Sequence, residues 1–61
     1  MPKYKKEDKI TIIGSGMQYK ILDIQTAKGS TIVGYTVQRI YFGSLIERKI
    51  QVYEDEIKLW K

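Results

Sequence analysis

The amino-acid sequence predicts an all-β fold, a small barrel of five strands. β-Branched and aromatic residues gather in short runs, and glycines separate the runs, which is the pattern of short strands joined by turns. No stretch repeats its apolar residues every 3.6 positions, as an amphipathic helix would. A chain of 61 residues has room for one domain with a modest core.

The first two strands are expected at residues 9–13 and 19–26. In the first strand isoleucines alternate with polar neighbours, and Gly14-Ser15-Gly16 ends it as a turn. The second strand contains Ile21-Leu22-Asp23-Ile24. This run breaks the alternation, which indicates a bulge or a position buried on both sides.

The longest strand is expected at residues 31–42. Gly34 lies inside it, and a glycine within a long strand indicates a sharp bend or a close approach of the kind a curling sheet needs. Gly43-Ser44 then turns the chain. The fourth strand, residues 46–53, is therefore expected to form a hairpin with the third.

A short fifth strand is expected at residues 57–60. Glu54-Asp55-Glu56 precedes it and is predicted to be an acidic turn, either irregular or a single helical turn. The predicted core collects the apolar residues assigned to the inward faces of the strands. It comprises Ile10, Ile12, Leu22, Ile24, Val33, Tyr35, Val37, Ile50, Val52, Ile57 and Leu59.

Residues 1–8 are expected to form a basic N-terminal arm before a barrel domain of residues 9–61. Such an arm is either a solvated, flexible tail or a contact for phosphates. Tyr4 is expected to fold back onto the barrel, and Trp60 to seal its other end.

This layout, with a long third strand and a single turn before the last, resembles the Src-homology-3-like small barrels. The opening Lys6-Glu7-Asp8-Lys9-Ile10-Thr11-Ile12-Ile13 is similar to the Gly-Asp-x-Val-x-Val start of such domains, including KOW modules, with Glu7 at the position of the glycine. Residues 50–59 resemble their closing strands, and Gly14-Ser15-Gly16 is similar to the turn of small bacterial and phage proteins of the YodC family. The resemblance implies the barrel. It does not imply proline-peptide binding, because the aromatic and acidic residues of that site are not recognisable in order.

The residue types that most catalytic chemistry needs are missing. The chain has no Cys and no His, so it lacks a thiolate nucleophile, an imidazole base and the usual zinc ligands. Ser15, Ser30 and Ser44 each stand beside a glycine in an expected turn, and Glu54-Asp55-Glu56 lacks the spacing of a calcium loop. We therefore predict a binding protein that is not an enzyme, with no cofactor and no metal site.

Composition also bears on location. A chain without Cys fits a reducing compartment, so a cytoplasmic location is expected. The charged start Met1-Pro2-Lys3-Tyr4-Lys5-Lys6 is not followed by an apolar run of signal-peptide length. No run approaches the ~18 apolar residues of a membrane helix, so we expect no membrane partner.

Residues 41–46, which we call the hairpin tip, are the most informative segment. Hairpin tips are usually polar, yet this one carries two aromatic and two aliphatic residues around Gly-Ser. Exposed apolar clusters of this kind mark interfaces. The sequence thus predicts a protein partner or self-association through Tyr41, Phe42, Leu45, Ile46, Arg39 and Arg48. The alternative is that Tyr41 or Phe42 plugs the end of the barrel.

A formal net charge of +4 leaves DNA or RNA as an alternative partner. Residues 1–40 hold seven basic and three acidic residues, whereas residues 41–61 hold four of each, so a basic face would come from the first two-thirds of the chain. Aromatic rings beside cations at the tip also suit stacked bases. The candidate nucleic-acid contacts are Lys5, Lys6, Lys20, Lys28, Arg39, Arg48 and Lys49. A third alternative is an oligomer that holds a small anionic ligand between its subunits.

Overall fold

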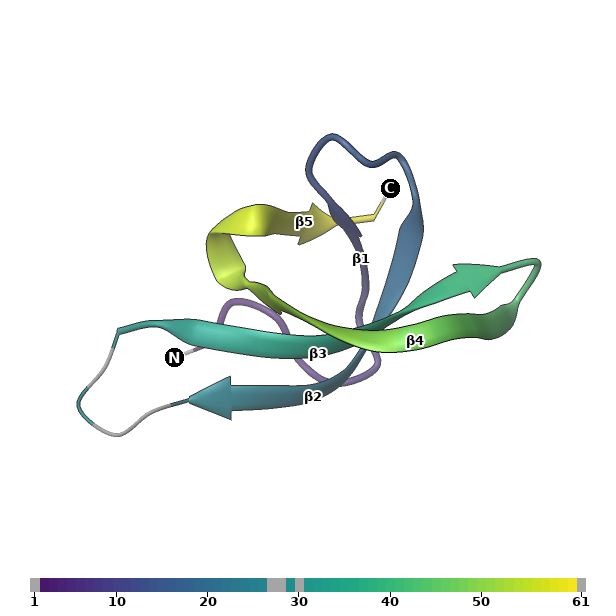
Figure 1. The fold of residues 1–61 in the computed structure, drawn as a ribbon. Helices are drawn as coiled ribbons and strands as arrows, with labels where there is room; N and C mark the ends of the chain where they lie inside the picture. Colours follow the sequence, from purple (N-terminus) through teal and green to yellow (C-terminus); the bar gives the residue numbers. More distant parts are fainter. Residues whose placement is uncertain (1, 27–28, 30, 61) are drawn as a thin grey trace.

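The computed structural model describes residues 2–26, 29 and 31–60, and it shows five antiparallel strands in one sheet (Figure 1). They are β1 (Lys9–Ile12), β2 (Gln18–Thr26), β3 (Val33–Tyr41), β4 (Ser44–Tyr53) and β5 (Ile57–Leu59), and a 3₁₀ turn, η1 (Glu54–Glu56), precedes β5. Strands β1 to β4 form a meander, and β5 returns to pair with β1, so the order is β4-β3-β2-β1-β5. The predicted all-β class and the helical turn before the last strand are confirmed.

The sheet is not closed into a barrel, and the prediction of closure is wrong. A barrel requires its two edge strands to pair with each other, but β4 pairs only with β3 and β5 only with β1 among the described residues. The length of β5 explains the opening. Its three residues are all matched to β1, and η1 turns the chain away from β4 immediately before it (Figure 1).

The core lies on the inner face of the curled sheet. Its buried apolar residues are Ile10, Ile21, Tyr35, Val37, Val52 and Ile57. Ile12, Ile24 and Val33 pack against this cluster at partial burial. Strand β3, which lies between β4 and β2, supplies two of the six buried side chains, Tyr35 and Val37.

Three residues of the predicted core are not buried in it. Of the two alternatives for the second strand, the bulge is the one present, since the register of β2 shifts between Ile21 and Asp23. Leu22 occupies the extra position, so Ile21 faces inward in its place. Ile50 and Leu59 do share the inner face with Val37 and Ile10, their cross-strand partners. They remain 40% and 51% exposed because they lie on the two edge strands, β4 and β5, which do not pair with each other to cover them.

Gly34 permits a close approach of side chains on the outer face. A Cβ atom there would lie 3.2 Å from Nε2 of Gln51 on β4. That amide donates a 3.5 Å hydrogen bond to Oε1 of Gln25 on β2. The two glutamines thus bridge β2 and β4 across β3 at the one position in β3 without a side chain.

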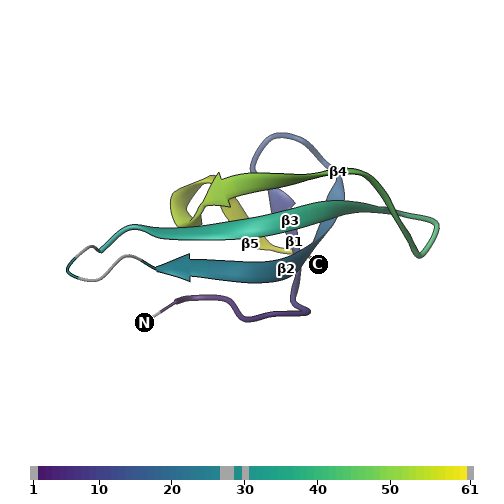
Figure 2. The same cartoon turned by 60° about the horizontal axis from the view of Figure 1, so that its bottom comes forward.

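The N-terminal segment lies along the sheet beside β2 (Figure 2). Glu7 donates its backbone N–H to the Ile21 carbonyl at 2.9 Å, and Ile21 donates to the Asp8 carbonyl at 3.0 Å. The ring of Tyr4 packs edge-on against Tyr35, with 5.7 Å between centroids. Tyr4 therefore covers the core, as the sequence predicts.

The bulge in β2 makes a direct prediction for two adjacent residues. Ile21→Ala should cost about 2–5 kcal/mol of unfolding free energy, because it empties a fully buried site. Leu22→Ala should cost less than about 1 kcal/mol, because the side chain leaves a half-exposed position. Urea unfolding of the two variants checks this, and equal losses would contradict the register described.

Candidate functional site

A two-residue turn joins β3 to β4 and presents Phe42 to solvent. Tyr41 pairs with Ser44, so Phe42 and Gly43 are the central residues, and their φ angles are 50° and 78°. Positive φ at both central positions is the type I′ arrangement, which favours Asn-Gly and is strained for a bulky residue. The Phe42 side chain is 89% exposed. It does not plug the end of a barrel, and burial does not explain why it occupies a strained position.

The aromatic side chains of the hairpin tip are held against a cation. The Tyr41 and Phe42 rings meet edge to face, with centroids 4.3 Å apart. The guanidinium of Arg39 lies 5.6 Å from the Tyr41 centroid, within the range of a cation–π contact. Tyr41 is thereby fixed between Arg39 and Phe42, which pre-organises the exposed rings.

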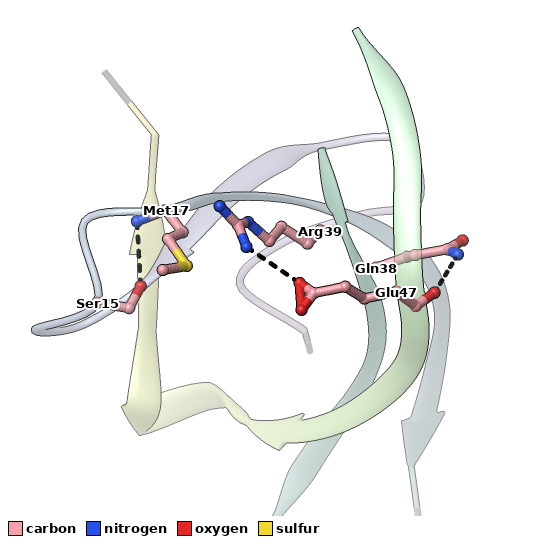
Figure 3. A network of polar contacts seen from close by, with 5 residues as sticks. All are labelled: Ser15, Met17, Gln38, Arg39 and Glu47. Atoms are coloured by element: carbon pink, nitrogen blue, oxygen red, sulfur yellow. Dashed lines mark hydrogen bonds and ion pairs between the residues drawn. The ribbon is translucent and has the colours of Figure 1, made fainter. Parts of the chain in front are cut away.

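A bulge in β4 directs Glu47 toward Arg39. One residue of β3, Gln38, stands opposite three residues of β4 between the pairs Val37–Ile50 and Arg39–Ile46. Glu47 lies in this bulge with a φ of 66°. Its backbone carbonyl oxygen accepts a 2.9 Å hydrogen bond from the Gln38 side chain, and its carboxylate Oε2 lies 3.2 Å from Nη1 of Arg39 (Figure 3). These two contacts fix the base of the tip.

The apolar surface at the tip extends beyond residues 41–46. Leu45 is 43% exposed opposite Ile40, whereas Ile46 is half-buried opposite Arg39. Tyr41, Phe42 and Arg39 share a shallow hollow with two residues from distant parts of the chain, Met17 and Trp60. Both are exposed by about two-fifths.

Sequence reasoning did not assign Met17 or Trp60 to this surface. Met17 comes from the turn before β2, where its backbone N–H bonds to Ser15 Oγ (Figure 3). Trp60 follows β5, where its N–H bonds to the Lys9 carbonyl. The pairing of β2 with β3 brings Met17 to the tip, and the pairing of β5 with β1 brings Trp60 there. No local pattern reports these pairings. Their size and apolar character were the only available signal.

The described candidate nucleic-acid contacts differ in whether a carboxylate lies beside them. Three of the predicted cations lie beside carboxylates: Lys6 near Asp23 at 3.7 Å, Lys20 near Glu7 at 2.7 Å and Arg39 near Glu47 at 3.2 Å. Arg48 and Lys49 lie in the β4 bulge and make no ion pair with another described residue. The Lys5 side chain is exposed at the N-terminal segment, and Lys28 lies outside the described residues.

A second hollow lies at the opposite end of the β3–β4 hairpin. We call it the acidic hollow; its lining includes Lys3, Ile32, Val33, Tyr53, Glu54 and Asp55. Its volume of about 470 Å³ falls in the range of binding pockets. Ile32 is 63% exposed and Tyr53 is 54% exposed. The sequence predicts the acidic turn, but not the apolar residues beside it.

The acidic hollow is tied to the core through Tyr35. The Tyr35 hydroxyl donates a 2.6 Å hydrogen bond to Glu54 Oε2 and accepts a 3.3 Å bond from the Tyr4 N–H. The hydrogen bond from Tyr35, followed by the 2.9 Å bond from the Lys3 N–H, lowers the pKa of Glu54. Burial, and then the same bond to Glu54, raises the pKa of Tyr35 to about 12.

Comparisons with protein-family models, curated proteins and solved structures return no significant match. Across the described parts of the chain, no helix has the length and apolar character to cross a membrane. The same residues contain no group of three His, Cys, Asp or Glu side chains arranged to hold a metal ion. The argument for function therefore depends on the two surfaces themselves.

The Tyr35–Glu54 contact predicts how stability depends on pH. A lowered pKa in the folded state means that Glu54 contributes stability above its ordinary pKa of 4.5 and loses it as the pH falls further. The raised pKa of Tyr35 means that stability is complete below pH 10 and declines as the pH rises through 12.

Unfolding free energies measured from pH 3 to pH 7 test the acid limb. Glu54→Gln should flatten it, because no charge is then gained or lost at that position. Tyr35→Phe should cost about 1–2 kcal/mol at neutral pH through the lost hydroxyl contacts. An acid limb as steep in Glu54→Gln as in the wild-type protein would contradict the assignment. Asp55→Asn is a matched control, since Asp55 makes no hydrogen bond with another described residue.

Proposed function

We propose that this chain is a non-catalytic protein-interaction module whose contact surface is the hairpin tip. The observation that supports it is Phe42, a bulky residue in a strained turn position with 89% of its side chain exposed. Strain of this kind persists where function requires the residue. Asn would satisfy the backbone of the turn better, so the ring is retained for what it contacts outside the chain.

The surroundings of Phe42 suit a protein partner. Tyr41, Leu45, Met17 and Trp60 add exposed aromatic and aliphatic area around it, and interface centres are enriched in such residues. Arg39 is held in place by Glu47 and Tyr41. Rigid aromatic anchors beside an ordered arginine lose little conformational entropy on binding.

We also infer that the fold is an open member of the Src-homology-3-like class. Four strands in a meander, a 3₁₀ turn and a fifth strand returning to the first support this assignment. The absence of Cys and His from the chain supports a binding role over an enzymatic one, and a cytoplasmic setting is proposed from the same absence of Cys.

The tip can be tested by separating folding from binding. Phe42→Asn with Leu45→Ser removes the exposed ring and the aliphatic group, and the asparagine should raise hairpin stability by about 0.5–1 kcal/mol by relieving the positive φ. We expect a folded variant with unchanged or higher melting temperature that no longer associates. Association that survives in this variant would remove the proposal.

Because the partner is unknown, a photo-crosslinking residue at position 42 gives a direct readout. Benzoylphenylalanine in place of Phe42, in the full chain expressed in cells, should capture a protein adduct upon illumination. The same residue in place of Thr36, on the outer face of β3, is the matched control. Adducts at both positions, or at neither, would contradict a contact surface at the tip.

Nucleic acid is the second candidate, and one cross-strand pair favours it. Lys9 and Lys20 stand directly opposite each other on β1 and β2, an arrangement that is destabilising without a counter-anion. Glu7 supplies one carboxylate, 2.7 Å from Lys20. A nucleic-acid backbone would supply further negative charge opposite Lys9 and Lys20.

This candidate predicts retention on DNA or RNA that weakens steeply with salt. The slope should be about one logarithmic unit of affinity per logarithmic unit of salt for each phosphate contacted. Lys9→Gln with Lys20→Gln should reduce the slope by about two. A chain that is not retained at low salt, near 50 mM, does not bind nucleic acid through these residues.

A further inference from the structure

The β3–β4 hairpin carries an apolar surface at each end, and the two surfaces have opposite charge. Around the hairpin tip stand three cations, Arg39, Arg48 and Lys49, and one carboxylate, Glu47. At the acidic hollow, η1 supplies two lining carboxylates, Glu54 and Asp55, and Lys3 supplies one ammonium group. Both surfaces also expose aromatic side chains, Phe42 at the first and Tyr53 at the second.

The two surfaces of one molecule cannot meet. β3 extends for nine residues from Val33, which lines the acidic hollow, to Tyr41 at the tip, and a strand of that length spans about 26 Å. Figure 1 shows the tip and the end of the hairpin that carries the hollow pointing in opposite directions along the sheet. Any contact between the two surfaces is therefore a contact between two molecules.

We propose that the hairpin tip of one copy of this chain docks into the acidic hollow of a second copy, head to tail. This inference rests on the proposed role of the tip as a protein-binding surface and names a second copy as the partner. Phe42 enters between Ile32 and Tyr53, and Arg48 faces Asp55. Arg48 and Asp55 make no hydrogen bond or ion pair with other described residues, so each brings an uncommitted charge to the contact.

Charge disfavours the simplest competing arrangement. In a symmetric dimer of two tips, Arg48 and Lys49 of one copy would face the same residues of the other, and like charges in an interface oppose association. The head-to-tail contact pairs unlike charges instead. Because every open assembly keeps one free tip and one free hollow, the contact continues into longer chains until the assembly closes into a ring.

Charge reversal tests the contact. Arg48→Glu gives a molecule with acidic groups at both ends, and Asp55→Lys gives one with basic groups at both ends. Each variant alone should associate about tenfold more weakly than the wild-type chain, or worse. An equimolar mixture should recover association, because the reversed tip of the first fits the reversed hollow of the second.

The measurement is solution mass by sedimentation equilibrium across concentrations from about 10 µM to 1 mM, the range expected for a small contact. The wild-type chain should form trimers and larger assemblies that dissociate as salt shortens the screening length to about 3 Å at 1 M. Lys58→Glu on β5 makes the same charge change as Arg48→Glu away from both surfaces, so it should associate like the wild-type chain. Circular dichroism verifies that each variant is folded, and Lys49→Glu replaces Arg48→Glu if the latter is not.

The outcomes separate this inference from the proposed function. If Phe42→Asn with Leu45→Ser abolishes association while Asp55→Lys leaves it intact, the tip is an interface but the acidic hollow is not its receptor, and the inference is overturned. A wild-type chain that remains monomeric at 1 mM also overturns it, and the crosslinking at position 42 then decides whether the tip binds a different protein. Failure of the mixture to recover association excludes the Arg48–Asp55 contact.

Discussion

The hydroxyl group of Tyr35 joins two segments to strand β3, the turn η1 and the N-terminal segment. Neither segment is paired with β3 as a strand. Tyr35 donates to Glu54 in η1 and accepts from the N–H of Tyr4 in the N-terminal segment, while its fully buried ring anchors both to β3. Because Glu54 also accepts from the Lys3 N–H, one carboxylate and one phenol hold the start of the chain against the turn before β5. The acidic hollow exists because these segments are held together, since its lining comes from both of them and from β3.

The open edge of the sheet has the widest consequences for the surface. Had β4 paired with β5, Ile50 and Leu59 would lie inside a closed barrel, as cross-strand partners of Val37 and Ile10 should. Strand β5 has three residues and β4 has ten, so β5 is too short to pair along β4. The protein therefore keeps a small buried core and leaves several large apolar side chains exposed.

The strained turn at Phe42 and the bulge at Glu47 act on the same hairpin in different ways. The turn places an aromatic ring in solvent at the cost of a positive φ. The bulge directs the Glu47 carboxylate toward Arg39, and the Arg39 guanidinium contacts the Tyr41 ring. The bulge also interrupts the exposed edge of β4 with charged residues, which discourages uncontrolled edge-to-edge pairing. The hairpin thus exposes apolar side chains at its tip, while charged residues interrupt its long edge.

The sequence by itself determined the strand content, the turns, the break in alternation in β2 and the apolar hairpin tip, because alternation, glycine position and β-branched runs are local properties. Local patterns also placed an acidic turn before β5. They could not report that β5 stops short of β4, that Leu22 yields its inward position to Ile21, or that Met17 and Trp60 arrive beside Tyr41. Tertiary structure decided these points, since each depends on which edges pair and where the register shifts. The pairing of β3 with β4 placed a basic tip and an acidic hollow at opposite ends of one hairpin.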